Sequence, residues 1–184
     1  MMKIRSFKLS DVPQLKEFTD QAIGTNYYST EELTDFYQRS LQSGKECSLI
    51  LEDKDLKIKG VRITFPPGQW QHGKGHGLSP GLWGLPQNQV AYFQSLFIDA
   101  SLTGQGWGKK MSLTAINILK DLGAKAIVTH SWKQSPHDSS GKYLRSLGFQ
   151  SIAFHPLYWK DVDYVCPQCG KPCLCTAEEM ILFL

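Results

Sequence analysis

The sequence has no long hydrophobic run. Its apolar stretches reach only the length of a β-strand, whereas a membrane-spanning helix needs roughly 20 apolar residues. The first residues, Met1 to Ser6, contain no apolar segment of the kind found in a secretory signal. We therefore expect no membrane association and a cytoplasmic location.

Basic residues are few and scattered. The formal net charge is +3, and the lysines and arginines form no run. Proteins that bind nucleic acid through its phosphates concentrate basic residues in a patch or stripe, so we expect no nucleic-acid partner.

The sequence also has no internal repeat, and its hydrophobic fraction of 41% is that of an ordinary globular protein. A length of 184 residues fits one domain over 1–184.

The five cysteines are unevenly distributed. Cys47 stands alone in an apolar segment, where we expect a small buried hydrophobic residue. In a reducing compartment a tight cluster is more typical of a metal site than of disulfides. Four sulfurs suit tetrahedral Zn²⁺, and a closed set of four predicts a structural metal; disulfides or a redox pair are the alternatives. The candidate ligands lie in a Cys-rich insertion at 156–178 and are Cys166, Cys169, Cys173 and Cys175.

Apolar spacing and turn residues predict strands and helices in the order strand, helices, strands, helix, strand, helix, strands. A capping box at Ser29 and Glu32 marks one helix start, and Gly44 is expected to end that helix. The expected strands are 3–8, 47–52, 60–65, 90–98, 124–130, 151–154 and 179–184; the expected helices begin at Ser10 and span 29–44, 104–122 and 138–147.

A long segment at 66–88 shows no periodicity. It is rich in glycine and proline and carries Trp70 and Trp83. Such a long loop inside a compact domain is usually functional or mobile, so we expect either a lid or acceptor site, or an interaction surface. His72 and His76 are weaker candidates for metal ligands, because both stand beside glycines at irregular spacing.

Three glycines at alternate positions, Gly104, Gly106 and Gly108, follow the strand that ends at Ile98. The start of a helix has backbone N–H groups without intrahelical partners, and glycines let an anion approach them closely. The loop therefore predicts a pyrophosphate site, with a tight unliganded turn as the alternative. It lacks the Gly-Lys-Ser/Thr of a phosphate-binding P-loop, and its spacing matches a dinucleotide fingerprint poorly.

This loop resembles motif A of the GNAT superfamily of N-acetyltransferases, which reads Arg/Gln-x-x-Gly-x-Gly/Ala. Thr103 occupies the first, usually basic position. Further along, Tyr-Leu-Arg-Ser-Leu-Gly-Phe at 143–149 is similar to the end of the family's motif B. The order of the expected elements also fits the GNAT arrangement over most of the chain. The resemblance therefore implies an α/β (α+β) fold, in which a mixed, mostly antiparallel sheet is splayed in its middle and carries helices on both faces.

The resemblance implies an enzyme that moves an acetyl group from acetyl-CoA to a primary amine. The acceptor is unidentified, a small molecule or a protein. The alternative is a non-catalytic acyl-CoA-binding or sensing protein of the same fold. By analogy with the family, Leu96, Phe97 and Ile98 would bind pantetheine and the acetyl carbonyl. The residues expected to bind the pyrophosphate are Thr103, Gly104, Gln105, Gly106, Trp107, Gly108 and Lys109.

Catalytic residues are harder to assign. In the family a tyrosine of motif B commonly protonates the departing thiolate, but that position is Leu144 here. Its neighbour Tyr143 is the candidate acid, with a packing role as the alternative. His137 is a second candidate proton carrier, or an exposed histidine before a helix. The central strand offers only Gln94 and Ser95 where relatives place a base, so no general base is assigned.

Overall fold

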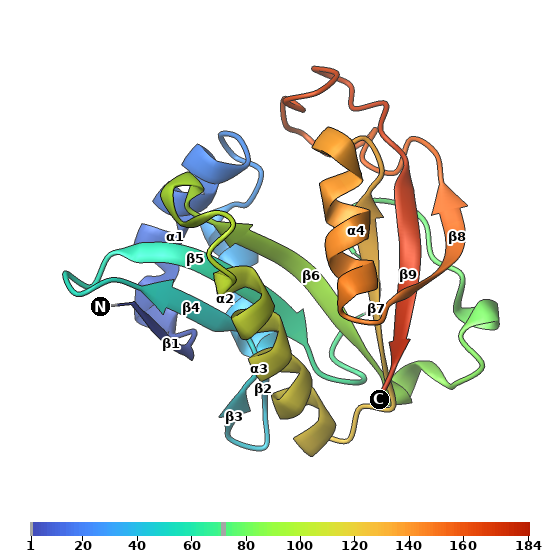
Figure 1. Ribbon diagram of the computed structural model, residues 1–184, viewed down its shortest axis with the longest axis horizontal. Coiled ribbons are helices and arrows are strands. Elements are labelled where there is room, and N and C mark those ends of the chain that lie inside the picture. The colour runs from blue at the N-terminus through green and yellow to red at the C-terminus, as the bar shows by residue number, and fades with distance from the viewer. Residues whose placement is uncertain (1, 71–72) are drawn as a thin grey trace.

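A seven-stranded mixed sheet organises the protein (Figure 1). The computed structural model describes residues 2–70 and 73–184. The strand order is β1-β4-β5-β6-β7-β9-β8, and every neighbouring pair is antiparallel except β6 and β7. This confirms the predicted mixed, mostly antiparallel sheet. The strands are β1 (Lys3–Ser6), β4 (Leu49–Glu52), β5 (Ile58–Phe65), β6 (Val90–Ile98), β7 (Ala126–Trp132), β8 (Gln150–His155) and β9 (Ala177–Phe183).

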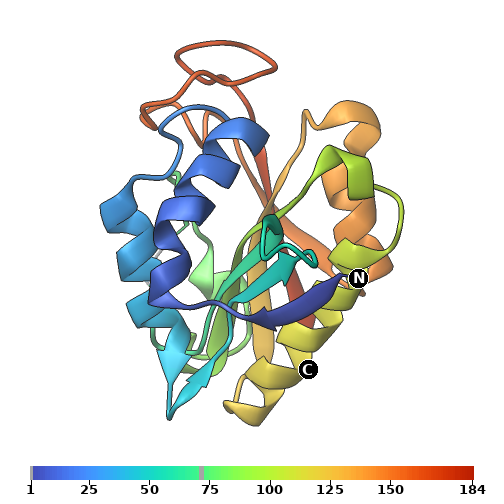
Figure 2. The same ribbon diagram turned by 90° about the vertical axis from the view of Figure 1, so that its left-hand side faces the viewer.

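Helices cover both faces of the sheet (Figure 2). One face carries α1 (Val12–Ala22) and α2 (Thr30–Ser40), and the other carries α3 (Trp107–Asp121) and α4 (Ser139–Ser146). Each face has its own hydrophobic core, because the two sides of each strand bury alternate residues. Leu33 and Phe36 belong to the first core, and Met111 and Leu119 to the second. Within the described residues, no helix is long and apolar enough to cross a membrane.

The sheet opens between its two parallel strands. The β6–β7 ladder runs only from Val90 with Ala126 to Phe93 with Thr129. Beyond that point β6 continues beside β5 alone, while β7 continues beside β9. In the β5–β6 ladder, Ile63 pairs with Ser95 but Thr64 pairs with Phe93, so Gln94 is an extra residue in β6. Such a bulge bends its strand, and here it lies where the strands part.

Local signals explain most helix ends, with one correction. The capping box of α2 is present, since Ser29 accepts from the amide of Glu32 and Glu32 reaches back to that of Ser29. The helix nevertheless ends at Ser40, and the prediction that it continues to Gly44 is wrong. A small hairpin follows, β2 (Leu41–Gln42) with β3 (Lys45–Glu46). Ser43 and Gly44 have φ of 52° and 74°, and positive φ at both central residues suits a hairpin turn.

The segment 66–88 packs against the sheet. Trp70 and Trp83 are buried in the same core as α1 and α2. Their indole nitrogens donate to the Val90 carbonyl and to Glu179, each at 2.8 Å. Both rings are therefore core residues. His76 is exposed and lies 3.8 Å from Asp161; His72 lies outside the described residues.

Glycine is required where this segment crosses the sheet. A Cβ on Gly75 would lie 2.2 Å from the carbonyl oxygen of Tyr158, and one on Gly77 would lie 2.5 Å from the His155 ring. Real Cβ atoms do not approach so closely, so a side chain at either position would lift the segment off Tyr158 and His155.

We expect Gly75→Ala to destabilise the protein by about 1–3 kcal/mol, the usual cost of overpacking. Gly81→Ala is the matched control, because a Cβ on Gly81 would meet no atom within 4 Å and its φ is not positive. Urea denaturation of both variants measures the difference. Equal stabilities would contradict the close packing of this segment on Tyr158.

Candidate functional site

The opening between β6 and β7 forms a cleft of about 560 Å³. One part, here called the cofactor half, is lined by Leu96, Phe97, Ile98, Thr103 and Tyr143. The other part, the acceptor half, is lined by residues from the end of α1, the α1–α2 turn and the β8–β9 loop: Ala22, Ile23, Tyr27, Trp159, Tyr164, Cys166 and Pro167.

The glycine loop joins β6 to the start of α3 beside the cofactor half. Gly106 is the residue before the helix and has a left-handed backbone, with φ of 80°. Gly104 has φ of 79°, and a Cβ on either glycine would meet nothing within 4 Å. The first helical amides, those of Trp107 to Lys109, have no intrahelical partners by the geometry of an α-helix. The loop therefore presents donors beside open space, as an anion site requires.

Hydrogen bonds to Asp99 and packing of Gly108 on β6 hold the glycine loop in place. Asp99 accepts from the Ser101 hydroxyl at 2.6 Å and from its amide at 2.9 Å, and these bonds lower the pKa of Asp99 to about 2. Gly108 packs against the β6 side chains, since a Cβ there would lie 3.2 Å from Leu96. The helix starts at Trp107 and not at Gly104 as predicted, because Gly104 and Gly106 have left-handed backbones. The structure also separates these two open glycines from Gly108, which is packed.

Tyr143 lies on the wall of the cofactor half. Its hydroxyl is 2.9 Å from the carbonyl oxygen of Gly108 and 2.6 Å from the Ser112 hydroxyl, so it ties α4 to the first turns of α3. Leu144, its neighbour, is buried in the core under α3. His137 is exposed in the turn before α4 and is not among the residues lining the cleft.

Arg62 is a cleft residue that the sequence analysis missed. It comes from β5, its side chain is almost fully buried, and its guanidinium lies 3.7 Å above the Phe93 ring. Its Nε and Nη2 atoms have no hydrogen-bond partner among the described residues. Burial lowers the pKa of Arg62 to about 10, which still leaves it charged at neutral pH. A buried cation without a counter-ion is costly, so this part of the cleft is suited to an anion.

His130, also missed, stands at the base of the cleft just past the last β6–β7 pair. Its Nδ1 is 2.7 Å from the Tyr92 hydroxyl and 3.2 Å from that of Tyr158. Burial lowers the pKa of His130 to about 4, so the imidazole is neutral at neutral pH.

His130 lies near a hydrogen-bonded pair, in which His155 bonds Glu179 at 2.6 Å. These two histidines and Glu179 could together hold a metal ion, but Glu179 already accepts from Trp83 and His155.

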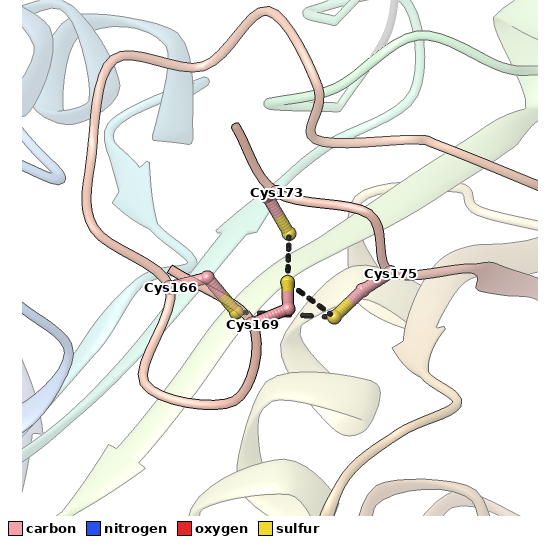
Figure 3. A group of neighbouring side chains, drawn as sticks. All are labelled: Cys166, Cys169, Cys173 and Cys175. Carbon is pink, nitrogen blue, oxygen red and sulfur yellow. Dashed lines mark hydrogen bonds between the residues drawn. The ribbon is translucent and has the colours of Figure 1, made fainter. Parts of the chain in front are cut away.

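The four clustered cysteines converge on one point (Figure 3). Sulfur–sulfur distances are 3.8 Å from Cys166 to Cys175, 3.9 Å from Cys169 to Cys173, and 3.6 Å from Cys169 to Cys175. All four ligand atoms lie within 4.8 Å of one another, and none forms a disulfide. Four sulfurs at about 2.3 Å from a zinc ion in a tetrahedron stand about 3.8 Å apart. The cluster therefore has the dimensions of an MS₄ site.

Hydrogen bonds of the backbone position the cysteines of the cluster. Cys166 and Gly170 exchange two backbone hydrogen bonds of 3.0 and 2.9 Å, which close the Cys-x-x-Cys-Gly turn. Gly170 takes a φ of 77° at the end of this turn. The amide of Leu174 donates to the Cys169 sulfur at 3.2 Å, a contact that stabilises a thiolate.

Comparison with known proteins agrees with this geometry. No protein-family profile matches the chain, and no curated protein matches it. Among solved structures, the ribosomal-protein-S18-alanine N-acetyltransferase of Escherichia coli superposes with a TM-score of 0.69 at 16% identity, covering 100% of this chain and 94% of its own. The putative acetyltransferase yncA of Salmonella typhimurium, solved with acetyl-CoA, gives 0.69 at 19% identity, covering 100% and 94%.

A GCN5-related N-acetyltransferase of Kribbella flavida gives a TM-score of 0.63 at 19% identity, covering 100% of this chain and 98% of its own. The parted sheet and glycine loop define an α/β protein with a cleft between two parallel strands. More particularly, the fold is that of the GCN5-related N-acetyltransferases, and the predicted GNAT fold is confirmed.

The unpaired charge of Arg62 gives a test on the ligand-free protein. We expect Arg62→Met to leave the free energy of unfolding unchanged or to raise it, because an uncompensated buried charge is replaced by an apolar chain. Arg5→Met is the contrast, since Arg5 pairs with Asp11 at 2.6 Å and Glu52 at 2.5 Å; its loss should cost about 1–3 kcal/mol. Urea denaturation decides, and a clear loss of stability in Arg62→Met would show that Arg62 has a partner in the free protein.

Proposed function

We propose that the protein binds acetyl-CoA and transfers its acetyl group to a primary amine. One observation carries the proposal: the cleft between β6 and β7 extends to Thr103, which directly precedes the open glycine loop at the start of α3. Acetyl-CoA bound in the cleft would thus have an anion site for its pyrophosphate in the glycine loop beside the cofactor half. The structural neighbours are N-acetyltransferases, one of them solved with acetyl-CoA, which supports the same function.

The cofactor is held mainly by backbone. Leu96, Phe97 and Ile98 pair with β5 on one edge, and their other edge has lost β7. Pantetheine carries amides that can pair with this free edge as an added strand does. The pyrophosphate takes the amides of the loop, whose residues are Thr103, Gly104, Gln105, Gly106, Trp107, Gly108 and Lys109.

The reaction needs an uncharged amine and a stabilised leaving group. The amine nitrogen forms a bond to the acetyl carbon and gives up a proton to solvent, the carbon–sulfur bond breaks, and the thiolate of CoA takes up a proton. Arg62 supplies positive charge within the cleft, where negative charge develops. Tyr143, on the wall of the same half, is the proposed proton donor to the thiolate.

No strong base faces the reacting groups. Within the part of the chain that the structure describes, no aspartate or glutamate lines the cleft. His130, whose pKa is lowered to about 4 by burial, is too weakly basic to deprotonate an ammonium ion efficiently. We assign it the task of orienting the neutral amine, with Tyr92 fixing its ring. His137, exposed outside the cleft, is left as a weaker candidate for moving protons.

The second candidate function is non-catalytic acyl-CoA binding. It is favoured by Leu144 at the position of the family's tyrosine and by the two hydrogen bonds that already engage the Tyr143 hydroxyl. Both functions require the cofactor half, so CoA release over a panel of amines separates them.

We also propose that the cysteine cluster holds a structural Zn²⁺. Four protein sulfurs at tetrahedral spacing leave no open position for a substrate. A reducing cytoplasm, the location we propose, would keep these thiols available for metal.

Gly106→Val should weaken the binding of CoA at least about tenfold, because a β-branched residue disfavours the left-handed backbone and moves the first amides of α3. Gly123→Val is the control: Gly123 has φ of 87° and an equally open surround, but stands after the far end of α3. Calorimetric titration with CoA measures both affinities. Unchanged affinity in Gly106→Val would place the pyrophosphate elsewhere, and no binding to the wild type would remove the proposed function.

Tyr143→Phe should lower kcat for acetyl transfer by about a hundredfold if the hydroxyl protonates the thiolate. Affinity for CoA should change little, since the ring remains. The matched control is Tyr37→Phe, which should leave the rate unaltered because Tyr37 does not line the cleft. Rates are followed by thiol release, and full activity in Tyr143→Phe would assign its hydroxyl to the contact between α3 and α4 alone.

A further inference from the structure

The cysteine loop forms part of the cleft. Cys166 and its neighbour Pro167 line the acceptor half together with Tyr164 of the same loop. The turn after α1 forms the facing part, and the two segments touch: a Cβ on Gly24 would lie 3.5 Å from the carbonyl oxygen of Val165. In Figure 2 the loop lies above the end of α1.

We propose that the metal held by the four cysteines shapes the acceptor half of the cleft, so that metal controls acceptor binding while the cofactor half is independent of it. That an amine acceptor occupies this half rests on the proposed function. The metal-dependent shape of the wall can be measured without any acceptor.

The cysteine-bearing part of the loop has no regular secondary structure. Tyr158, Trp159 and Tyr164 anchor the loop in the core, but between β8 and β9 the chain forms only turns and the single Cys166–Gly170 bridge, and it contains no disulfide. Without a metal, the four thiols, which lie within 4.8 Å of one another, would be positioned only by that turn and by single hydrogen bonds such as the one from the Leu174 amide to the Cys169 sulfur. Loops whose fold depends on bound metal loosen when the metal is withdrawn.

A line of aromatic contacts leads from the cluster to the point where the strands part. The Tyr164 hydroxyl donates to the Cys173 sulfur at 3.3 Å. Its ring packs edge-on against Tyr27 at 4.9 Å, and Tyr27 packs against Tyr28 at 4.7 Å. The Tyr28 hydroxyl then bonds the Ser95 hydroxyl at 2.5 Å, and Ser95 lines the cleft beside the bulge in β6. A change at the cysteines is thereby transmitted to the reacting end of the cleft.

The same wall indicates the kind of acceptor. The acceptor half is lined by aromatic and apolar side chains, and no carboxylate lines the cleft in the described residues. A polycation would find no counter-charge there, whereas an amine on an aromatic or aliphatic body would bury apolar surface. A second cavity of about 570 Å³ shares only Gln94 with the cleft among the described residues; its carboxylates, Glu32 and Asp35, are paired with Lys74 and Arg39 of the same lining.

The experiment compares the wild type as purified with the same protein after chelation under reducing conditions. Hydrogen exchange is followed by mass spectrometry, metal by elemental analysis, and CoA affinity by calorimetry. We expect one Zn²⁺ per chain. Its removal should speed exchange in the loop at 156–176 and in the facing turn at 22–29, and leave the exchange at 103–110 and the affinity for CoA unchanged.

Matched variants separate the metal from general damage. Cys169→Ser alters the exposed member of the cluster and should reproduce the metal-free exchange pattern; Cys47→Ser alters a buried cysteine outside it and should not. In active protein, zinc removal should raise KM for 2-phenylethylamine about tenfold or more, and 2-phenylethylamine should be preferred to spermidine.

Three results would overturn the inference. The first is less than about a tenth of an equivalent of metal in the purified protein, with all four thiols titratable. The others are an exchange that becomes faster after chelation only at 156–176, or a loss of CoA affinity after chelation as large as the rise in KM for the amine. A preference for spermidine would overturn the assignment of the acceptor to the cysteine-lined wall. Failure of the wild type to bind CoA would instead remove the proposed function, while the exchange data would still report whether metal shapes the wall.

Discussion

The parting of β6 from β7 is the constraint on which the site depends. The two strands share four residue pairs, and the Thr129 hydroxyl bonds the Phe93 carbonyl at 2.9 Å across the last of them. Immediately afterwards Gln94 is inserted in β6 and the strands diverge. Backbone groups that a continuous sheet would pair are thereby left to face a cleft. Since unpaired buried backbone is costly, such a gap makes sense chiefly as a place for a ligand that completes the pairing.

Both parts of the cleft contain groups that a bound molecule could satisfy. Beside the cofactor half, Gly104 and Gly106 hold a left-handed backbone in open space, and in the cleft the Nε and Nη2 atoms of Arg62 have no hydrogen-bond partner among the described residues. Where the strands part, Nδ1 of His130 is bonded to the Tyr92 hydroxyl, but its buried Nε2 has no partner among the described residues. The neighbouring Glu179 accepts from Trp83 and His155, and these bonds hold that region in place.

The features predicted from sequence were those encoded locally. The glycine loop, the cysteine spacing and the capping box of α2 each depend on residues within a few positions. Apolar periodicity was enough for the order of elements, and the sheet type followed from the resemblance that this order and the glycine loop carry. Arg62 and His130 carried no local signal, because what singles them out is a cleft built from distant strands. The burial of Trp70 and Trp83 could not be predicted for the same reason. Their aperiodic segment packs through contacts with β6 and β9, which are distant in the sequence.

Topology explains why an insertion between β8 and β9 bears on the site at all. In the sheet β9 lies between β7 and β8, so Ala177 pairs with Trp132 on one side and with His155 on the other. The loop from β8 to β9 therefore leaves and re-enters the sheet at the end of β7 that borders the cleft. Residues added there extend the wall of the cleft, whereas residues added at the opposite end of these strands would lie far from it. A metal held by the four cysteines, as proposed, would add rigidity at this wall of the cleft.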